Sequence, residues 1–564
     1  MAFSKIIFNG TTLMDVTGDT VDTTNLLTGY TATKNDGTSI TGAYTPSGGG
    51  VEEVEAGVLF VDFDGTLLDA WESAEVADKT ALPSNPSHTD IGLTAQGWNW
   101  TLADVKSYIQ TYPTAVLTVG QVYTTTSGAS EIDITLDSTT LNPYLGICPN
   151  GTITVDWGDN SATDTLTGTS LSTLKWANHT YATGGNYTIK LIPATGTTYH
   201  FKGTDGGKGS IISETNSFTA TLLYASCVNA VRMGTGSGFE TAGMAGLRNV
   251  NYVTVPNGVT AISQTAFSNH RIRKAVIFPS GATSIGNNGM NSNYAVKYIS
   301  LPNSMTTFGT SSFSDASSAY AIAVPTGVTT LPDSVFQACR SLKHMTFPNG
   351  LTTIGQYAMR YCDAVRAINL SNTITSIGSS AFWSCFSLEK LVFPTGVTSA
   401  MNTSLFYQTY NLEEAIIQNG VTSIGSSAFY NSTSLMYVTL PNSVSTINSQ
   451  AFYGCRSMVE FRFTRTTAPT VSATSAWTSV PSSCLMLVPV GGLASYLSAS
   501  NYPSKSSFTY LGYGTYNNGV TLPAQDDTNA YNLTWYANKR DAKAQTNPIT
   551  LGNGAEVYCR YVAV

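Results

Sequence analysis

The sequence predicts a mainly β, multidomain protein in which a solenoid of 23-residue repeats is flanked by small β modules. Three observations predict this fold class. A proline recurs every 23 residues in the middle of the chain, at Pro256, Pro279, Pro302, Pro325 and Pro348. Apolar residues recur in register with it. Charged residues make up 11% of the chain, against roughly 25% in an ordinary soluble domain, and the Gly, Ser, Thr and Asn that replace them favour strands and turns.

The proline position, called the slot below, continues with one slip. Ser371 and Pro394 follow at the same spacing, one inserted residue moves the next slot to Gln418, and Pro441 ends the series. Apolar side chains stand six and eleven residues after the slot. The first column is Ile262, Ile285, Phe308, Leu331, Ile354, Ile377, Ile424 and Ile447, and the second is Phe267, Met290, Phe313, Phe336, Met359, Phe382, Phe429 and Phe452. Such columns form when each coil buries its apolar side on its neighbours.

A short strand is predicted before each slot. Alternation turns Val253 and Val255 inward and Tyr252 and Thr254 outward. The outward columns, four and two residues before the slot, carry tyrosines, a histidine and a charge pair. Tyrosine is favoured at interfaces because it supplies contact area with a polar tip. The candidate receptor-binding residues are Tyr252, Tyr298, His344, Asn369, Lys390, Glu414 and Tyr437. An ordinary solvated sheet face is the alternative.

Three cysteines follow the same period. Cys339, Cys362 and Cys385 are each 23 residues apart, no His or acid recurs beside them, and the chain has no CxxC pair. Because zinc sites need several such ligands in fixed spacing, the pattern favours a column of buried thiols over a metal site or disulfides.

The phrase V-T-x-I-G-x-x-A-F, clearest from Val421 to Phe429, resembles the BspA-type leucine-rich repeat of bacterial surface proteins. The resemblance covers about residues 245–465 and implies adhesion and binding of proteins or glycans, with no chemistry. Residues 201–244 are expected to cap the solenoid at its N-terminal end. Leu485 to Tyr502 looks like the closing segment of such arrays, so we expect a C-terminal cap over 466–514.

The first 45 residues are predicted to form a separate module. Leu26 to Gly42 resembles a small module found near the ends of phage and prophage tail proteins, with a hairpin-type turn at Asn35-Asp36-Gly37. A Gly-rich linker over 46–56 follows. At the other end, residues 515–564 alternate Leu533 and Trp535, then Val557 and Cys559, with a turn signal at Asn553-Gly554, which predicts a small β domain.

Residues 131–200 are similar to the polycystic-kidney-disease-type β-sandwich. The resemblance rests on Trp157-Gly158-Asp159, His179-Thr180-Tyr181 and Tyr187, although Asn160 replaces the usual Gly. Asp156 and Asp159 could bind Ca²⁺, but this ion needs six to eight oxygen ligands. Two carboxylates on a turn more often accept backbone N–H groups, so we expect no metal there.

Val58 to Asp69 looks like the first motif of haloacid-dehalogenase-type phosphatases. That resemblance implies Asp62 as nucleophile and Asp64 as general acid beside Mg²⁺. The region 57–130 is too short for the doubly wound domain that such enzymes need, and it shows one good helix, capped by Thr101. We therefore predict a small α+β module, and no catalytic, cofactor-binding or metal-binding residues in the chain.

The net charge of −8 and the pI near 5.2 argue against a nucleic-acid partner. No apolar stretch reaches the ~18 residues of a membrane span, and the N-terminus lacks the apolar core of a signal peptide.

We predict a bacteriophage virion structural protein, a tail-associated adhesin or receptor-binding protein. Its N-terminal module would contact other virion proteins and its solenoid a host cell-surface protein or glycan. The alternatives are a BspA-type bacterial cell-surface adhesin and a purely architectural baseplate or head-fibre protein. The sequence leaves open whether the chain forms a homo-oligomer.

Overall fold

The computed structural model describes residues 54–136, 144–202, 227–240, 243–247, 250–269, 274–503 and 508–515, and the backbone of strands β1–β4, β15, β38 and β39. The chain divides into two compact units, Met1–Glu53 with Leu67–Ala70, and Val54–Thr66 with Trp71–Val564. Each unit is considered by itself.

The first unit holds a four-stranded antiparallel sheet in the order β2-β1-β3-β4. The strands are β1 (Ile6–Phe8), β2 (Thr11–Met14), β3 (Thr31–Thr33) and β4 (Ser39–Thr41). The turn signal Asn35-Asp36-Gly37 falls between the paired β3 and β4. The turn itself, and most of the phage-tail-like pattern from Leu26 to Gly42, lie outside the described residues.

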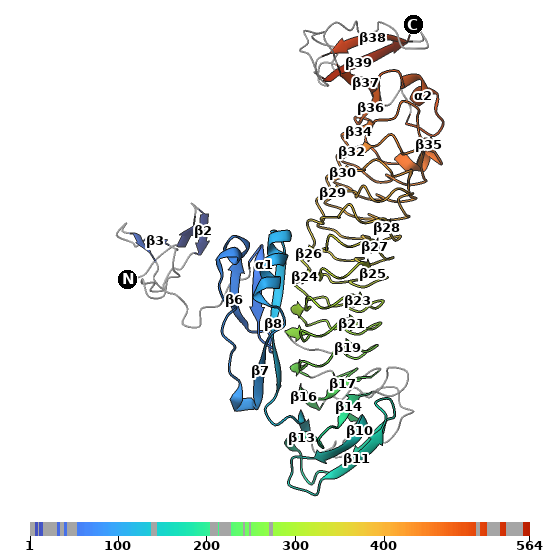
Figure 1. The fold of residues 1–564 in the computed structure, drawn as a ribbon. Helices are drawn as coiled ribbons and strands as arrows, with labels where there is room; N and C mark the ends of the chain where they lie inside the picture. The colour runs from blue at the N-terminus through green and yellow to red at the C-terminus, as the bar shows by residue number, and fades with distance from the viewer. Residues whose placement is uncertain are drawn as a thin grey trace. The chain divides into compact units, whose positions relative to one another are not determined.

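The second unit contains the solenoid, whose coils stack on one another (Figure 1). The strands before the slots are β18 (Tyr252–Thr254), β20 (Ala275–Ile277), β22 (Tyr298–Ser300), β24 (Ala321–Ala323), β26 (His344–Thr346), β29 (Lys390–Val392), β30 (Glu414–Ile416) and β32 (Tyr437–Leu440), and β34 (Glu460–Phe463) continues the row beyond the last slot. Neighbouring strands pair in parallel; Ala321, for example, lies opposite His344. Lys390 lies opposite Glu414, which confirms the predicted one-residue slip. The chain is mainly β, as the sequence predicted.

A second row of two-residue strands follows the slots. It comprises β19 (Ala261–Ile262), β21 (Ser284–Ile285), β23 (Thr307–Phe308), β25 (Thr330–Leu331), β27 (Thr353–Ile354), β28 (Ser376–Ile377), β31 (Ser423–Ile424), β33 (Thr446–Ile447) and β35 (Thr470–Val471). Both apolar columns predicted from the sequence are buried and belong to one hydrophobic core that runs the length of the solenoid. Phe382, for example, is fully buried and stacks on Phe406 with ring centroids 5.4 Å apart.

Each coil also contains a residue with left-handed backbone conformation nine residues after the slot, or ten after Pro394, where the inserted residue intervenes. The φ angles lie between 54° and 58° at Thr265, Asn288, Ser311, Ser334, Tyr357, Ser380, Ser404, Ser427 and Gln450. This left-handed conformation directs the backbone N–H toward the next coil. Ser311 donates to the Asp333 carbonyl at 3.0 Å, and Ser334 donates to the Gln356 carbonyl at 2.9 Å. Non-Gly residues rarely adopt this conformation, so these inter-coil hydrogen bonds offset a local strain.

The periodic cysteines are free and buried, as predicted. Each thiol donates to the carbonyl oxygen 26 residues earlier: Cys339 to Phe313 at 3.4 Å and Cys362 to Phe336 at 3.2 Å. Ser432 holds an equivalent position and donates to Phe406 at 3.2 Å. The column therefore consists of small hydrogen-bond donors that satisfy carbonyl groups inside the solenoid.

A β-rich cap closes the N-terminal end. Its strands are β9 (Ser130–Leu136), β10 (Tyr144–Asp156), β11 (Asp164–Thr169), β12 (Lys175–Asn178), β13 (Gly185–Pro193), β14 (Thr198–Phe201), β15 (Ile212–Ser213), β16 (Val228–Arg232) and β17 (Ser237–Phe239). β16 pairs antiparallel with β9 and parallel with β18, the first strand of the repeats. The region predicted as a sandwich thus shares its sheet and its hydrophobic core with the solenoid.

At the C-terminal end the solenoid sheet continues into β36 (Leu485–Pro489) and β37 (Thr509–Thr515), which pair in parallel. β39 (Glu556–Ala563) pairs antiparallel with both β37 and β38 (Tyr531–Tyr536). A 3-10 helix, η3 (Thr474–Trp477), and the short helix α2 (Leu493–Ser498) lie in the region predicted as the cap. The turn signal Asn553-Gly554 lies outside the described residues.

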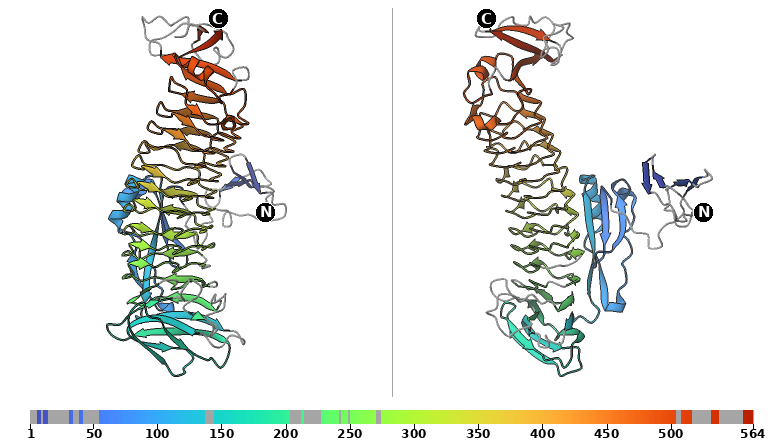
Figure 2. Two further views of the ribbon diagram at one scale, coloured as in Figure 1. Left: turned by 90° about the vertical axis from the view of Figure 1, so that its right-hand side faces the viewer. Right: turned by 180° about the vertical axis from the view of Figure 1, so that it is seen from behind.

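The module near residues 57–130 comprises β5 (Gly57–Val61), β6 (Leu67–Glu72), η1 (Ser73–Asp78), η2 (Thr89–Ile91), β7 (Leu93–Trp98), α1 (Leu102–Thr111) and β8 (Val116–Thr125). β8 pairs in parallel with β5 and antiparallel with β7. The predicted helix is present: Thr101 caps α1 by accepting a hydrogen bond from the Asp104 N–H. β8 lies along the outward face of the solenoid strands (Figure 2).

Candidate binding surface

The module near residues 57–130 is anchored to the solenoid by one side-chain donor for each of three consecutive repeats. Each donor reaches the carbonyl group just before a slot proline. The pairs are Asn99 with Phe278 at 2.9 Å, Trp100 with Leu301 at 2.7 Å and Tyr108 with Val324 at 3.1 Å. The periodic solenoid backbone thus provides regularly spaced acceptors, and the module matches their spacing.

The solenoid side of this interface combines several small outward side chains with the larger Ile277 and Tyr298. Ser300, Ala321 and Ala323 are all buried beneath the module. Gly120 of β8 approaches so closely that a Cβ there would lie 2.5 Å from the Ile277 side chain. This contact requires glycine at position 120, and the small outward residues let the two backbones come close.

Two of the predicted binding residues are consequently not open to solvent. Tyr298 is 6% exposed. Tyr252 is half-buried: its ring packs against Phe63 at 4.6 Å and its hydroxyl accepts a hydrogen bond from Arg232 at 3.1 Å. The expectation of an open face along the whole solenoid is therefore wrong for the first repeats, because the sequence pattern did not reveal that another module covers them.

The later repeats leave their outward face uncovered by any described residue. Lys390 and Glu414 form the expected charge pair, with Nζ 2.7 Å from Oε2. Tyr437 is 45% exposed and Val392 44% exposed, and Asn369 is also exposed. We call the outward side chains from Asn369 to β32 the open strand face.

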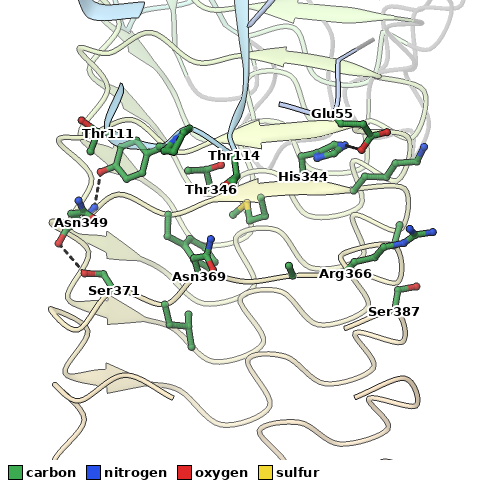
Figure 3. A pocket seen from close by; sticks show the side chains of 18 residues that line it. Glu55, Thr111, Thr114, His344, Thr346, Asn349, Arg366, Asn369, Ser371 and Ser387 are labelled. Atoms are coloured by element: carbon green, nitrogen blue, oxygen red, sulfur yellow. Dashed lines mark hydrogen bonds and ion pairs between the residues drawn. The ribbon is translucent and has the colours of Figure 1, made fainter. Parts of the chain in front are cut away.

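A pocket of about 800 Å³ lies where the module ends and the open strand face begins. Figure 3 shows Thr111 with Asn349 and Ser371 on one side of it, and His344 with Arg366 on the other. Thr346 and Asn369 lie between them. The pocket brings together two predicted binding residues, His344 and Asn369, whereas Lys390, Glu414 and Tyr437 do not line it.

On each side of the pocket, a residue from the N-terminal part of the second unit contacts the solenoid. The Tyr112 hydroxyl, from the end of α1, accepts a hydrogen bond from the backbone N–H of Asn349 at 2.8 Å. The Ser371 hydroxyl donates to the Asn349 carbonyl at 3.4 Å. On the opposite side, Nε2 of His344 lies 3.6 Å from Oε2 of Glu55.

Sequence reasoning missed several pocket residues. Lys343 and Arg366 lie five residues before their slots, outside the two outward columns predicted from the sequence. The recurrence of charged residues at this position is the signal that could have identified them. The wall formed by Thr111, Tyr112 and Thr114 comes from a different module. The local sequence pattern does not indicate which surface of the solenoid that module covers.

Asp62 and Asp64, the two aspartates of the phosphatase-like motif, accept hydrogen bonds within a turn. Asp62 is 2% exposed, and one of its oxygens accepts the Phe63 N–H at 2.8 Å while the other lies 2.7 Å from Nε2 of His88. Asp64 accepts the Thr66 N–H at 2.8 Å. Both carboxylates are therefore engaged within the chain, at a site whose sheet is not doubly wound.

Asp156 and Asp159, the two aspartates of the region predicted as a sandwich, also accept hydrogen bonds within a turn. Asp156 accepts the Gly158 N–H at 2.9 Å, and Asp159 accepts the Ser161 N–H at 3.1 Å and lies 2.7 Å from Nε2 of His179. Burial raises the pKa of Asp159, but the hydrogen bonds from Ser161 and His179 outweigh it and lower that pKa to about 2. Among the described residues, no three His, Cys, Asp or Glu side chains cluster as metal ligands would. Within the same residues, no helix is long and apolar enough to cross a membrane.

Comparison with known proteins identifies the repeats. The family described as BspA type leucine rich repeat region matches residues 244–365 and 329–459. No curated protein shows significant similarity to this chain. Among solved structures, a leucine-rich repeat protein from Bacteroides ovatus is 21% identical, over 51% of this chain and 85% of that protein, with a TM-score of 0.38.

Two further structures are similar. A leucine rich cell surface protein from Faecalibacterium prausnitzii is 20% identical, covering 44% of this chain and 87% of that one, with a TM-score of 0.25. The pneumococcal vaccine antigen PcpA is 14% identical, covering 55% of this chain and 84% of that one, with a TM-score of 0.28. The match of the family to residues 244–459, together with the stacked 23-residue coils, shows that the solenoid of this chain is built from leucine-rich repeats of the BspA type.

Proposed function

We propose that this chain is a repeat-based binding protein of the bacterial cell surface, which attaches to a macromolecule through the open strand face and the adjoining pocket. The observation that carries the proposal is a change in side-chain type along the solenoid. Beneath the module, the outward residues are mostly alanine or serine, whereas beyond it they include Lys390, Glu414 and Tyr437. Packing within the coil does not require these long, polar side chains. Tyrosine is enriched at protein interfaces, and the solvent-accessible rim of an interface is polar, as Lys390 and Glu414 are.

The repeat type supports the surface location, because BspA-type repeats are those of bacterial surface proteins. The sequence had favoured a phage virion first, on the pattern from Leu26 to Gly42. The family match falls on residues 244–459 and supports the cell-surface alternative better. We also propose that the chain has no enzymatic activity, since Asp62 and Asp64 are engaged in a turn.

Bead adhesion tests the binding role. Full-length protein on fluorescent beads should attach to epithelial cell monolayers, and the double variant Lys390→Ala/Tyr437→Ala should lose about tenfold in adhesion, since a loss of ~1.4 kcal/mol has that effect. The matched control Arg456→Ala/Tyr294→Ala removes an exposed cation and an exposed aromatic ring away from the open strand face. Equal adhesion by both variants and the unaltered protein would refute the binding role of this face.

Immunogold labelling tests the location. Antibodies against the full chain should label the envelope of intact cells of the source organism. Labelling confined to phage tails among the particles released by lysis would replace the cell-surface proposal with the virion one.

A further inference from the structure

A row of four basic side chains with one tyrosine at its centre runs along one edge of the strand face, five residues before the slots. It comprises Lys274, Lys297, Tyr320, Lys343 and Arg366. Backbone hydrogen bonds hold these positions in register: the N–H of Lys297 donates to Lys274 at 2.8 Å, that of Tyr320 to Lys297 at 2.9 Å and that of Lys343 to Tyr320 at 2.9 Å. Neighbours in the row are thus one strand apart, at ~4.8 Å. We call this set the basic row.

The row is unusual for this chain, which has 27 Lys and Arg against 35 Asp and Glu. All four cations of the row are exposed. Like charges on adjacent strands repel and destabilise a sheet, so solenoid packing gives no reason for the row. Tyr320 lies at its centre, with the ammonium groups of Lys297 and Lys343 at 5.9 and 5.5 Å from its ring centroid. The next two positions are Glu389 and Glu413, so the positive edge ends after Arg366.

The basic row leads into the pocket, because Lys343 and Arg366 line it. Beyond these cations the lining offers hydroxyl and amide groups, among them Thr111, Thr346 and Asn369. The lining also holds one carboxylate, Glu55, which lies 3.6 Å from His344. Within the part of the chain that the structure describes, the side chains of Arg366 and Asn369 form no hydrogen bond or ion pair. Cations pair with carboxylates and sulfates, and convergent hydroxyls and amides orient polyhydroxylated ligands in pockets of this size.

We infer that the basic row and the pocket together bind a linear acidic polysaccharide, with one sugar unit in the pocket and the chain following the row toward Lys274. This inference rests on the proposed function and adds the class of ligand. A linear polymer fits because the cations are themselves in a line: the row spans four strand spacings, about 19 Å.

Calorimetric titration of the full-length protein tests the ligand class. The probes are oligogalacturonides of increasing length, dextran sulfate and neutral dextran. Both anionic polymers should bind and neutral dextran should not. Affinity for oligogalacturonides should rise with length and fall between about 50 and about 300 mM salt, because exposed charges are screened. Comparing the two anionic polymers separates recognition of carboxylate from that of sulfate.

Variants test the site. Lys343→Gln/Arg366→Gln should weaken oligogalacturonide binding at least about tenfold, since charge-assisted hydrogen bonds to the carboxylates are lost. Lys175→Gln/Arg456→Gln makes the same change in net charge at exposed positions away from the row and should bind as the unaltered protein does. Equal losses in both variants would show unspecific electrostatic attraction and overturn the site. Equal binding of neutral dextran would overturn the ligand class, and binding that does not increase with oligomer length would overturn the role of the row.

Bead adhesion separates this inference from the proposed function. If beads adhere to cells but no acidic polysaccharide binds or competes, the inference is refuted while the binding role stands, with a protein as the ligand. If neither adhesion nor polysaccharide binding is observed, both are refuted.

Discussion

The indole N–H of Trp100 donates a hydrogen bond to the carbonyl oxygen of Leu301 at 2.7 Å, and both residues are 2% exposed. This bond joins two modules that are 201 residues apart in the chain.

Trp100→Phe should loosen the attachment of this module. The Leu301 carbonyl would stay buried without its donor, which costs about 1–3 kcal/mol. Hydrogen exchange should show faster exchange in β22 and β24. The control Trp98→Phe removes a hydrogen bond to Pro83 inside the module and should leave these solenoid strands unaffected. Unchanged exchange in β22 and β24 of the Trp100 variant would contradict a structural role for the bond.

Tyr298 and Tyr437 occupy the same column but should respond differently to truncation. Tyr298→Ala empties a site that is 6% exposed, so unfolding free energy should fall by about 3–5 kcal/mol. Tyr437→Ala, at a site that is 45% exposed, should cost less than about 0.5 kcal/mol. Chemical denaturation of the two variants checks this, and similar losses at both sites would mean that the module does not cover Tyr298.

The periodic cysteines should be unreactive in the folded protein. Burial raises the pKa of Cys339 and of Cys385 to about 12, and that of Cys362 well above its ordinary value. Because the thiolate is the reactive form, iodoacetamide at pH 8 should modify these three residues only after denaturation. Mass spectrometry of labelled peptides provides the measurement, and rapid labelling without denaturant would show that the column is accessible.

Acid should weaken the turn around Asp159. Its pKa is lowered from 3.8 to about 2 in the folded chain, and a carboxyl with a depressed pKa stabilises the fold above its unfolded value and loses this effect as pH falls toward the folded one. Stability near β11 and β13 should therefore decline between pH 4 and pH 2. Asp159→Asn should remove that part of the pH dependence, measured by hydrogen exchange, whereas Asp156→Asn, which removes a turn hydrogen bond, should retain it.

The repeat region was predictable because each coil imposes the same packing requirement. Ile354 and Phe382 belong to columns of apolar residues because an inward position tolerates only apolar side chains. The one-residue slip between Lys390 and Glu414 was also visible in the sequence, as a shift of the slot. The pocket was predictable only in part. His344 and Asn369 were identified from the outward columns, but the position of Tyr112 depends on how one module docks on another.

A signal for that docking was nevertheless present. Ala275, Ser300, Ala321 and Ala323 make the outward face small in consecutive repeats, as a close approach of two backbones requires. Small residues at outward positions are also compatible with an open surface, so the sequence pattern did not distinguish a covered face from an exposed one. The donors Asn99 and Trp100 gave no such signal, since their partners are backbone carbonyls.

The one-donor-per-repeat attachment has a mechanical consequence. Asn99, Trp100 and Tyr108 hold three successive coils to one rigid body, so a pulling force cannot separate those coils without first detaching the module. The coils from β29 to β34 are held, among the described residues, by their immediate neighbours, as in other repeat arrays. Under tension the solenoid should therefore lengthen coil by coil from its later repeats, while the segment beneath the module yields last and in a single step.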